Sequence, residues 1–373
     1  MAWEVKKLGD VCEVIAGQSP EGKYYNNIED GLPFYQGKKE FTDKYLGEPT
    51  TWTTNITKEA QKDDVLMSVR APVGPINFST QKICIGRGLA AIRAGKMIDK
   101  DFLFNFLLNH ENKLIGNMGA VFNSINKTQI ENIKIPLPPL PIQKRIVAIL
   151  DKAFENISKA KENAEKNLEN SNEIFESYLQ SVFENKGDGW EEKTLNQISE
   201  NLDGKRVPIT KNVRNSGSIP YYGASGVVDY VKEYLFDEEL LLVSEDGANL
   251  LARTYPIAFS ITGKTWVNNH AHVLRFESTI TQKFVELYLN SIKLDDFVSG
   301  MAQPKLNQAM LNKIPIPLPP ILIQKVIVAK SNSLSAETKQ LSSIYEKKLS
   351  SLEELKKSIL QKAFNGELTK VAV

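Results

Sequence analysis

The chain of 373 residues has few cysteines, no long apolar run and almost no net charge, and each absence excludes a class of protein. Cys12 and Cys84 stand alone, without CxxC spacing, so the sequence predicts neither a disulfide framework nor a zinc site and favours a reducing compartment. No apolar run approaches the roughly 20 residues that span a bilayer. The opening segment MAWEVKKLGD lacks the apolar core of a signal peptide. We therefore expect a cytoplasmic protein without a membrane partner.

The charge balance does not indicate an extended nucleic-acid surface. The chain carries 46 Lys and Arg against 45 Asp and Glu, a net charge of +1. Domains that bind nucleic acid usually carry a basic patch or a basic overall charge. Binding to DNA would therefore depend on local groups of basic side chains, and not on a basic domain.

The sequence also lacks a catalytic constellation. The segment AFSITGKT (258–265) ends like a phosphate-binding loop, but Ala258 occupies the place of its first glycine. His270 and His272 lie two positions apart on a predicted strand, with no third ligand at useful spacing, so no metal site is predicted. We expect a non-catalytic chain; an enzyme with a degenerate nucleotide loop is the weaker alternative.

What the sequence does contain is an internal repeat. KIPLPPLPIQKRIVAILD (134–151) returns as KIPIPLPPILIQKVIVA (313–329), with Pro139 and Pro320, and Gln143 and Gln324, each 181 positions apart. Three further matches are WEVKKLGDV (3–11) with WEEKTLNQI (190–198), LPFY (32–35) with IPYY (219–222), and YLQSVF (178–183) with ILQKAF (359–364).

Each repeat predicts a globular region, a stiff proline segment and a long helix. Short runs with β-branched and alternating apolar residues predict strands in the globular regions. In 142–182, apolar or small residues recur at steps of 3 and 4, which is the spacing of one helical face. In 334–359, Leu334, Leu341 and Leu355 belong to a seam near 3.5 residues. We expect the two helices to pack on each other as an intramolecular coiled coil.

The proline segments are predicted to fix the angle between each globular region and its helix, because prolines exclude helix before them and stiffen the chain. Pro141 suits the first helical turn, where its missing N–H is not needed.

The whole pattern resembles the specificity subunit of type I restriction–modification systems. The likeness lies in the duplicated proline–glutamine motif, the W-E-x-K-x-L openings and the closing LQKAFNGELT (360–369). The family usually has Glu before the glutamine of the motif, where Ile142 and Ile323 stand here.

The resemblance implies an α+β fold: two similar α/β globular target-recognition domains joined by two long antiparallel helices that form an intramolecular coiled coil, with a pseudo-twofold repeat. The expected bounds are 1–140 for the first target-recognition domain, 141–187 for the first long spacer helix, 188–320 for the second target-recognition domain, and 321–373 for the second spacer helix and C-terminal tail.

The resemblance also implies a function. Each globular domain would read one half of a bipartite, asymmetric target in double-stranded DNA, and the coiled coil would set the spacing. Two methyltransferase (M) subunits and restriction (R) subunits would be its partners. S-adenosylmethionine, ATP and Mg would belong to those partners, and this chain would hold no cofactor. A coiled-coil scaffold with two protein- or glycan-binding heads and no DNA role is the open alternative, favoured by the near-neutral heads.

Candidate DNA contacts are basic or amide side chains near predicted turns, which suit phosphates and base edges. Tyr35 and Tyr222, matched in both repeats, are predicted to belong to the framework. The outer helix faces and the proline segments are candidates for the methyltransferase interface. The candidate DNA contacts are Lys38, Lys39, Arg70 and Arg87 in the first domain, and Lys205, Arg206, Lys211, Arg214, Lys264 and Asn269 in the second.

Overall fold

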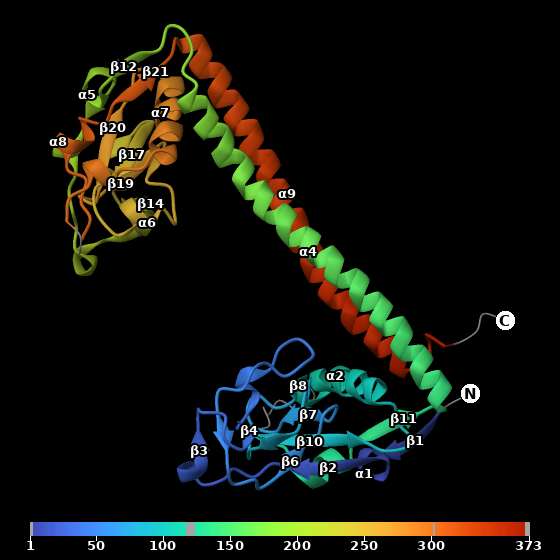
Figure 1. The fold of residues 1–373 in the computed structure, drawn as a ribbon. Helices are drawn as coiled ribbons and strands as arrows, with labels where there is room; N and C mark the ends of the chain where they lie inside the picture. The colour runs from blue at the N-terminus through green and yellow to red at the C-terminus, as the bar shows by residue number, and fades with distance from the viewer. Residues whose placement is uncertain (1–2, 117–123, 301–302, 370–373) are drawn as a thin grey trace. The chain divides into compact units, whose positions relative to one another are not determined.

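The computed structural model describes residues 3–116, 124–300 and 303–369, and Figure 1 traces the chain. The chain divides into two compact units. Unit 1 consists of 1–164 and 347–373, and unit 2 consists of 165–346. Each unit therefore contains one globular head, part of α4 (Leu140–Glu184) and part of α9 (Ile321–Phe364). These two helices lie within a few residues of the predicted spacer segments.

Unit 1 is built on antiparallel strands, with one parallel pairing. The sheet β2-β10-β7-β8 contains Cys12–Ala16, Leu89–Ala94, Val65–Ser68 and Ile76–Phe78, in that order. The sheet β3-β5-β4-β9-β6 contains Tyr25–Asn26, Trp52–Thr53, Leu32–Tyr35, Ile83–Ile85 and Glu59–Ala60, and its β4–β9 pair is parallel. The remaining elements are β1 (Glu4–Lys7), paired with β11 (Lys134–Leu137), α1 (Leu8–Val11), α2 (Lys100–Gly116), α3 (Lys127–Glu131), and the 3-10 turns η1 (Gly22–Tyr24) and η2 (Lys38–Glu40).

Unit 2 repeats this plan. Its sheet β13-β20-β17-β18 contains Glu200–Asn201, Ala271–Arg275, Leu240–Ser244 and Ala258–Ile261. The sheet β15-β14-β19-β16 contains Gly226–Val231, Ser216–Gly223, Lys264–Val267 and Phe236–Asp237, and its β14–β19 pair is parallel. The remaining elements are β12 (Glu191–Lys193), paired with β21 (Ile316–Leu318), α5 (Leu195–Ile198), α6 (Asn249–Ala252), α7 (Thr279–Ser291), α8 (Gln308–Leu311), and the turns η3 (Asp203–Lys205), η4 (Lys211–Val213) and η5 (Asp295–Phe297).

The core of each head lies between a sheet and a helix. All four residues of β7 are buried, and α2 packs against the sheet through Phe102 and Leu103. In unit 2 all five residues of β17 are buried, and α7 supplies Phe284 to the same core. Uninterrupted apolar runs suit strands that are covered on both faces. The buried strands thus provide rigid frames on which exposed turns are held.

The proline segments begin as strands and end as helices, as predicted. Pro136 in β11 pairs with Val5, and Pro317 in β21 pairs with Glu192. Each pair forms a two-stranded sheet, where a proline is tolerated because one side of the strand needs no ladder hydrogen bond. Pro141 lies in the first turn of α4, as expected. In each repeat, the opening strand therefore pairs with the proline strand and joins the two ends of the head.

The glutamine of the motif fixes the start of each long helix. The Gln143 side chain is fully buried; its Nε2 donates to the Pro138 and Met97 carbonyls at 2.8 and 3.0 Å, and its Oε1 accepts from the Asp99 N–H at 2.8 Å. Gln324 Nε2 donates to the Pro319 carbonyl at 2.7 Å. Its Oε1 has no hydrogen-bond partner in the described part of the chain. The motif is equivalent in both repeats, but it is fully satisfied only in unit 1.

The long helices run antiparallel within each unit (Figure 1). In unit 1, Lys161 forms an ion pair with Glu353 at 2.9 Å, and in unit 2 the Ser171 and Ser342 hydroxyls are 3.0 Å apart. Each helix also completes a head with its last turn. Phe364 of α9 packs edge-on against Phe102 of α2, with ring centroids 5.2 Å apart. The matching residue of α4, Phe183, packs edge-on against Phe284 and Tyr288 of α7 in unit 2. No described helix is long and apolar enough to cross a membrane.

The seam of α4 agrees with the prediction, but the seam predicted for α9 is partly wrong. Ile146, Ile157 and Ala164, which belong to the predicted face of α4, are buried. In α9, by contrast, Leu341 and Leu355 are exposed, while small polar residues such as Ser331 and Thr338 are buried. The leucines of α9 therefore follow more than one helical stripe, and the buried stripe includes small polar residues that the leucine spacing did not indicate.

Candidate nucleic-acid interface

Two of the predicted contacts of unit 1 line one cleft. Lys39 of η2 and Arg87, on the turn between β9 and β10, border a cleft of about 640 Å³. Its wall includes Tyr25 and Phe34, whose rings stack with centroids 4.8 Å apart. Both basic side chains are exposed. The cleft therefore presents two cations beside an aromatic wall, a combination suited to a polyanion with planar bases.

The other two predicted contacts of unit 1, Lys38 and Arg70, are exposed as well. Lys38 precedes Lys39 in η2. Arg70 follows Val69, whose N–H donates to the Gly88 carbonyl at 2.9 Å, so the backbone next to Arg70 contacts the turn that carries Arg87. The four predicted residues of unit 1 thus lie on neighbouring loops of the fold. Their contact with DNA stays a prediction.

In unit 2, two of the predicted contacts are used inside the protein. Arg206 Nη1 donates to Glu245 and to the Ala271 carbonyl, both at 2.7 Å, and its side chain is only 13% exposed. Arg214 donates to Asp229 at 2.9 Å and lies over the Tyr221 ring at 4.2 Å. Both guanidinium groups therefore hold loops of unit 2 in place, a role that the sequence did not indicate.

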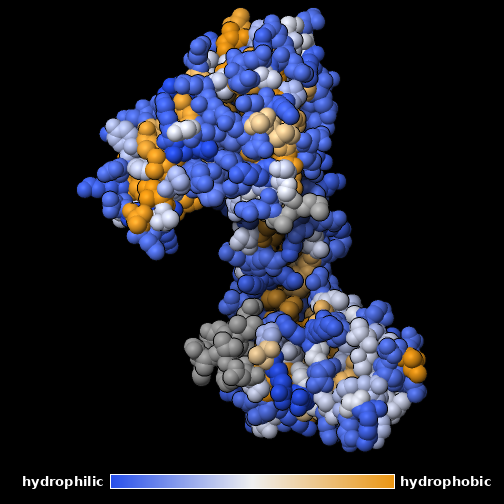
Figure 2. Space-filling view, turned by 90° about the vertical axis from the view of Figure 1, so that its left-hand side faces the viewer, coloured by the Kyte–Doolittle hydropathy of each residue, from blue (hydrophilic) through white to orange (hydrophobic). Residues whose placement is uncertain are grey.

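The other predicted residues of unit 2 are exposed: Lys205 on η3, Lys211 on η4, Lys264 on β19, and Asn269 on the turn before β20. None of these four forms a salt bridge within the described residues. Lys264 Nζ lies 4.8 Å from the centre of the Tyr234 ring. In Figure 2 hydrophilic residues cover most of the visible face and hydrophobic residues are exposed in separate patches. Unit 2 thus exposes three lysines and one amide among its predicted contacts.

The two framework tyrosines take the predicted role. Tyr35 is buried, and its hydroxyl donates to the Gly47 carbonyl at 2.9 Å. Tyr222 is partly buried against the second core cluster of unit 2, while its neighbour Tyr221 is the fully buried tyrosine of that strand. Both matched residues stand where a parallel strand ends.

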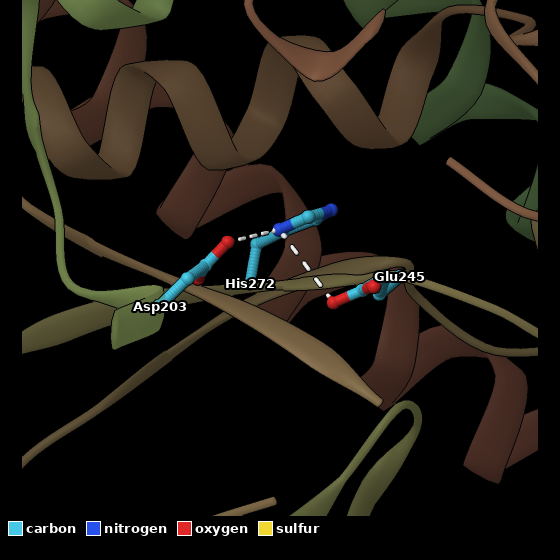
Figure 3. A group of neighbouring side chains, drawn as sticks. All are labelled: Asp203, Glu245 and His272. Carbon is cyan, nitrogen blue, oxygen red and sulfur yellow. Dashed lines mark hydrogen bonds and ion pairs between the residues drawn. The ribbon is translucent and has the colours of Figure 1, made fainter. Parts of the chain in front are cut away.

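A buried polar cluster in unit 2 was not predicted. His272 Nδ1 lies 2.6 Å from Asp203 and 3.9 Å from Glu245 (Figure 3). His272 Nε2 lies 2.7 Å from the Leu306 carbonyl oxygen. Both ring nitrogens of His272 therefore lie within hydrogen-bond distance of protein oxygens. Sequence spacing could not reveal this group, since its members come from three distant segments.

The cluster is a salt-bridge network, although its residue types also occur in metal sites. Arg206 pairs with Glu245 at 2.7 Å and with Asp203 at 3.5 Å, so both carboxylates of the cluster already have a cationic partner. Burial alone would raise the pKa of Asp203, but the hydrogen bond and charge of His272 and the charge of Arg206 hold it below its ordinary value. The pKa of Glu245 is lowered against its burial as well, chiefly by Arg206 and His272. The network joins η3, the end of β17 and β20.

The segment that resembled a phosphate-binding loop has a different structure. Residues 258–261 form β18 and 264–267 form β19, so a strand begins at Lys264, directly after Gly263. A phosphate-binding loop leads into a helix whose N-terminus faces the phosphates. The nucleotide-binding alternative therefore loses its structural basis.

Comparison with known proteins places both repeats in one family. The family model described as "Type I restriction modification DNA specificity domain" matches residues 2–169 and again 187–354. The putative type I restriction enzyme MjaX specificity subunit of Methanocaldococcus jannaschii is 44% identical over 175 residues, covering 43% of this chain and 41% of that protein. The chain thus spans less than half of that relative in the match. The type I restriction enzyme MjaVIII specificity subunit of the same organism is 25% identical and covers 98% of this chain and 93% of the relative.

Solved structures show the same fold. A chain from a study of complex assembly and conformational transition of the type I R-M system has a TM-score of 0.77, with 98% of both chains covered and 18% identity. The HsdS subunit from Thermoanaerobacter tengcongensis has a TM-score of 0.66, with 98% of this chain and 97% of that chain covered, also at 18% identity. The likeness extends over both heads and both long helices, as the resemblance implied. With its two matched domains, the chain belongs to the family of type I restriction–modification DNA specificity subunits.

Proposed function

We propose that this chain selects the DNA sequence on which a type I restriction–modification complex acts. Each head would contact one half of a bipartite, asymmetric target in double-stranded DNA, and α4 and α9 would set the distance between the halves. The observation that carries the proposal is the duplication of one head frame with different side chains on its surface. A shared frame gives both heads the same way of docking, and different surface residues give each a different half-site.

The partner subunits of the proposal are two methyltransferase subunits and restriction subunits, which would bring S-adenosylmethionine, ATP and Mg. The chain itself would be non-catalytic. Exposed apolar side chains at the start of α9 support a docking surface for a methyltransferase subunit, since large exposed apolar groups mark protein interfaces. Leu322 is 70% exposed and Val326 is 65% exposed, one helical turn apart.

The first experiment maps N6-methyladenine across the source genome with the gene present, deleted and restored. We expect one bipartite motif to lose its methylation on deletion and to regain it on restoration. A methylation map that does not change on deletion would contradict the proposed function.

The second experiment tests the partner surface. The substitutions Leu322→Glu and Val326→Glu together are expected to abolish co-purification with a type I methyltransferase subunit of the source organism. Ile28→Glu is the matched control, because Ile28 is 78% exposed in unit 1 and lies far along the chain from α9. Co-purification that survives the α9 substitutions would refute this surface.

A further inference from the structure

Both heads contain a structurally equivalent turn between a parallel-paired strand and a central strand. In unit 1 the turn 86–88 joins β9 to β10, and in unit 2 the turn 268–270 joins β19 to β20. The Gly86 N–H donates to the Tyr35 carbonyl at 2.8 Å, and the Asn268 N–H donates to the Tyr222 carbonyl at 3.0 Å. The two turns thus begin on the same anchor, the framework tyrosine of each repeat.

A second anchor fixes where each turn ends. The Gly88 carbonyl accepts from the Val69 N–H at 2.9 Å, and the His270 carbonyl accepts from the Glu245 N–H at 2.9 Å. In unit 1 this donor follows β7, and in unit 2 it follows β17. The middle residue of the turn is therefore Arg87 in unit 1.

The strands after the turns confirm the register. Arg93 on β10 is paired with Glu13 at 3.0 Å, and Arg275 on β20 is paired with Glu200 at 2.8 Å. Arg87 precedes Arg93 by the same number of positions as Asn269 precedes Arg275. Arg87 and Asn269 therefore occupy one position of the repeated frame.

The turn of unit 1 is rigid. A Cβ on Gly88 would lie 2.4 Å from the Gln36 carbonyl oxygen, and a Cβ on Gly17 would lie 2.2 Å from the Gly86 carbonyl oxygen. Only glycines permit so close an approach of backbones. The Arg87 N–H donates to the Ser19 hydroxyl at 3.2 Å. The backbone that carries the Arg87 side chain is thus held on both sides.

The turn of unit 2 is fixed by side chains instead of glycines. Asn268 is buried, and its Oδ1 accepts from the His270 N–H at 2.8 Å. His270 Nδ1 lies 2.9 Å from the Asp246 carboxylate. Asn269, between them, is exposed. The middle residue of each turn, Arg87 in unit 1 and Asn269 in unit 2, is therefore an exposed polar side chain on a fixed backbone; His270, which follows Asn269, is exposed too but is paired with Asp246.

The two side chains differ in the base that each recognises. An Arg guanidinium donates two hydrogen bonds to O6 and N7 of guanine, and an Asn amide pairs with N6 and N7 of adenine. Arg87 forms no salt bridge within the described residues, so its guanidinium is not held by a carboxylate. Lys39, which borders the same cleft, suits a phosphate next to that base.

We infer that this turn is a base-reading position in both heads, with Arg87 reading a guanine in one half-site and Asn269 reading an adenine in the other. The inference rests on the proposed function and names the specificity-determining side chain of each head. A rigid support favours such a role, because discrimination between bases depends on a fixed direction of the hydrogen bonds.

The test co-expresses the chain with its methyltransferase subunit in a host without this methylation and measures methylation rates on a library of duplexes. In the Arg87→Ala variant, we expect the preference for guanine at one position of one half-site to fall about 5- to 140-fold, the range of a lost bidentate pair. In the Asn269→Ala variant, we expect a similar loss of adenine preference in the other half-site.

Two further variants separate base reading from charge. Arg87→Lys keeps the positive charge but loses the planar guanidinium, so it should also reduce the preference for guanine at that position. Lys82→Ala is the control, because Lys82 is an exposed cation of the same head, paired with Glu59 at 2.9 Å. This control should leave every position of the motif unchanged.

The outcomes are distinct. If the wild-type chain supports no bipartite methylation, the proposed function fails. If it supports methylation but both alanine variants keep the full motif, or both relax the same half-site, the base-reading inference is overturned. A motif unchanged by Arg87→Lys but weakened at all sequences by Arg87→Ala would make Arg87 a phosphate contact and overturn the inference too. So would loss of methylation at every sequence in both Arg87 variants, since a base contact changes the preference at one position.

Discussion

The buried glutamines of the two repeats, Gln143 and Gln324, occupy the same place in the motif but form different numbers of hydrogen bonds. Replacing Gln143 by Met removes three hydrogen bonds, to the carbonyls of Met97 and Pro138 and from the N–H of Asp99. At about 0.5–1.5 kcal/mol for each bond, the expected loss in free energy of unfolding is about 1.5–4.5 kcal/mol. Replacing Gln324 by Met removes one bond, to Pro319.

The second substitution should cost far less than the first. Gln324 Oε1 is buried without a partner among the described residues, and a buried unpaired polar atom costs about 1–3 kcal/mol. Removing that atom offsets the loss of the one bond, so Gln324→Met should be close to neutral. The near-equal volumes of Gln and Met keep cavity effects small in both variants.

The assay combines urea unfolding of the full chain with hydrogen exchange. In Gln143→Met we expect a lower urea midpoint and faster exchange in peptides that contain Asp99, because its N–H loses its acceptor. In Gln324→Met we expect exchange in the peptides around Pro319 to stay near wild type. Equal destabilisation by the two substitutions would refute the reasoning, since it would mean that the unequal numbers of hydrogen bonds do not set the stability.

Three further predictions concern the packing, the buried charges and the thiols. Phe364→Ala should lower the free energy of unfolding by about 3–5 kcal/mol in urea titrations, whereas Leu355→Ala, on the exposed face of α9, should change it by at most about 0.5 kcal/mol. Burial would raise the pKa of Asp203, but mainly His272 holds it below its ordinary value. The ionised Asp203 carboxylate therefore stabilises the fold fully above about pH 4–5, and this stabilisation is lost as the pH falls further. The dependence of the melting temperature on pH between pH 3 and 7 should be weaker in Asp203→Asn than in the wild type, and an unchanged dependence would contradict this. Burial raises the pKa of the Cys12 thiol to about 12, so in the folded chain a thiol reagent at pH 8 should leave Cys12 unmodified until urea is added.

Local patterns in the sequence predicted much of the framework. The repeated proline–glutamine motif marks a strand and the start of a long helix in both units, and the apolar stripe of α4 marks its buried face. These features could be predicted because they depend on neighbours along the chain. Pro136 and Pro317 pair with the opening strands of their repeats. The alignment of Tyr35 with Tyr222 likewise marks equivalent strand ends.

Features that depend on distant segments were missed. Arg206 follows a glycine-containing turn and looks like a surface cation, but its guanidinium is held by Glu245 from another strand end. His272 has no possible partner at short sequence spacing, yet Asp203, from the start of the head, lies 2.6 Å from its Nδ1. In α9, the leucine pattern could not decide which stripe faces α4, and Leu341 is exposed as a result.

The docking of Phe364 into unit 1 has a consequence for synthesis. Leu360, Ala363 and Phe364 belong to the same core as Phe102 and Ile146. A chain emerging from the ribosome presents the first head long before it presents these residues, so that core stays open until Phe364 has been translated. Unit 2, which draws on residues 165–346, can close earlier. Translation that stops within α9 would therefore leave the first-made head as the unfinished one, with apolar surface exposed to proteolysis.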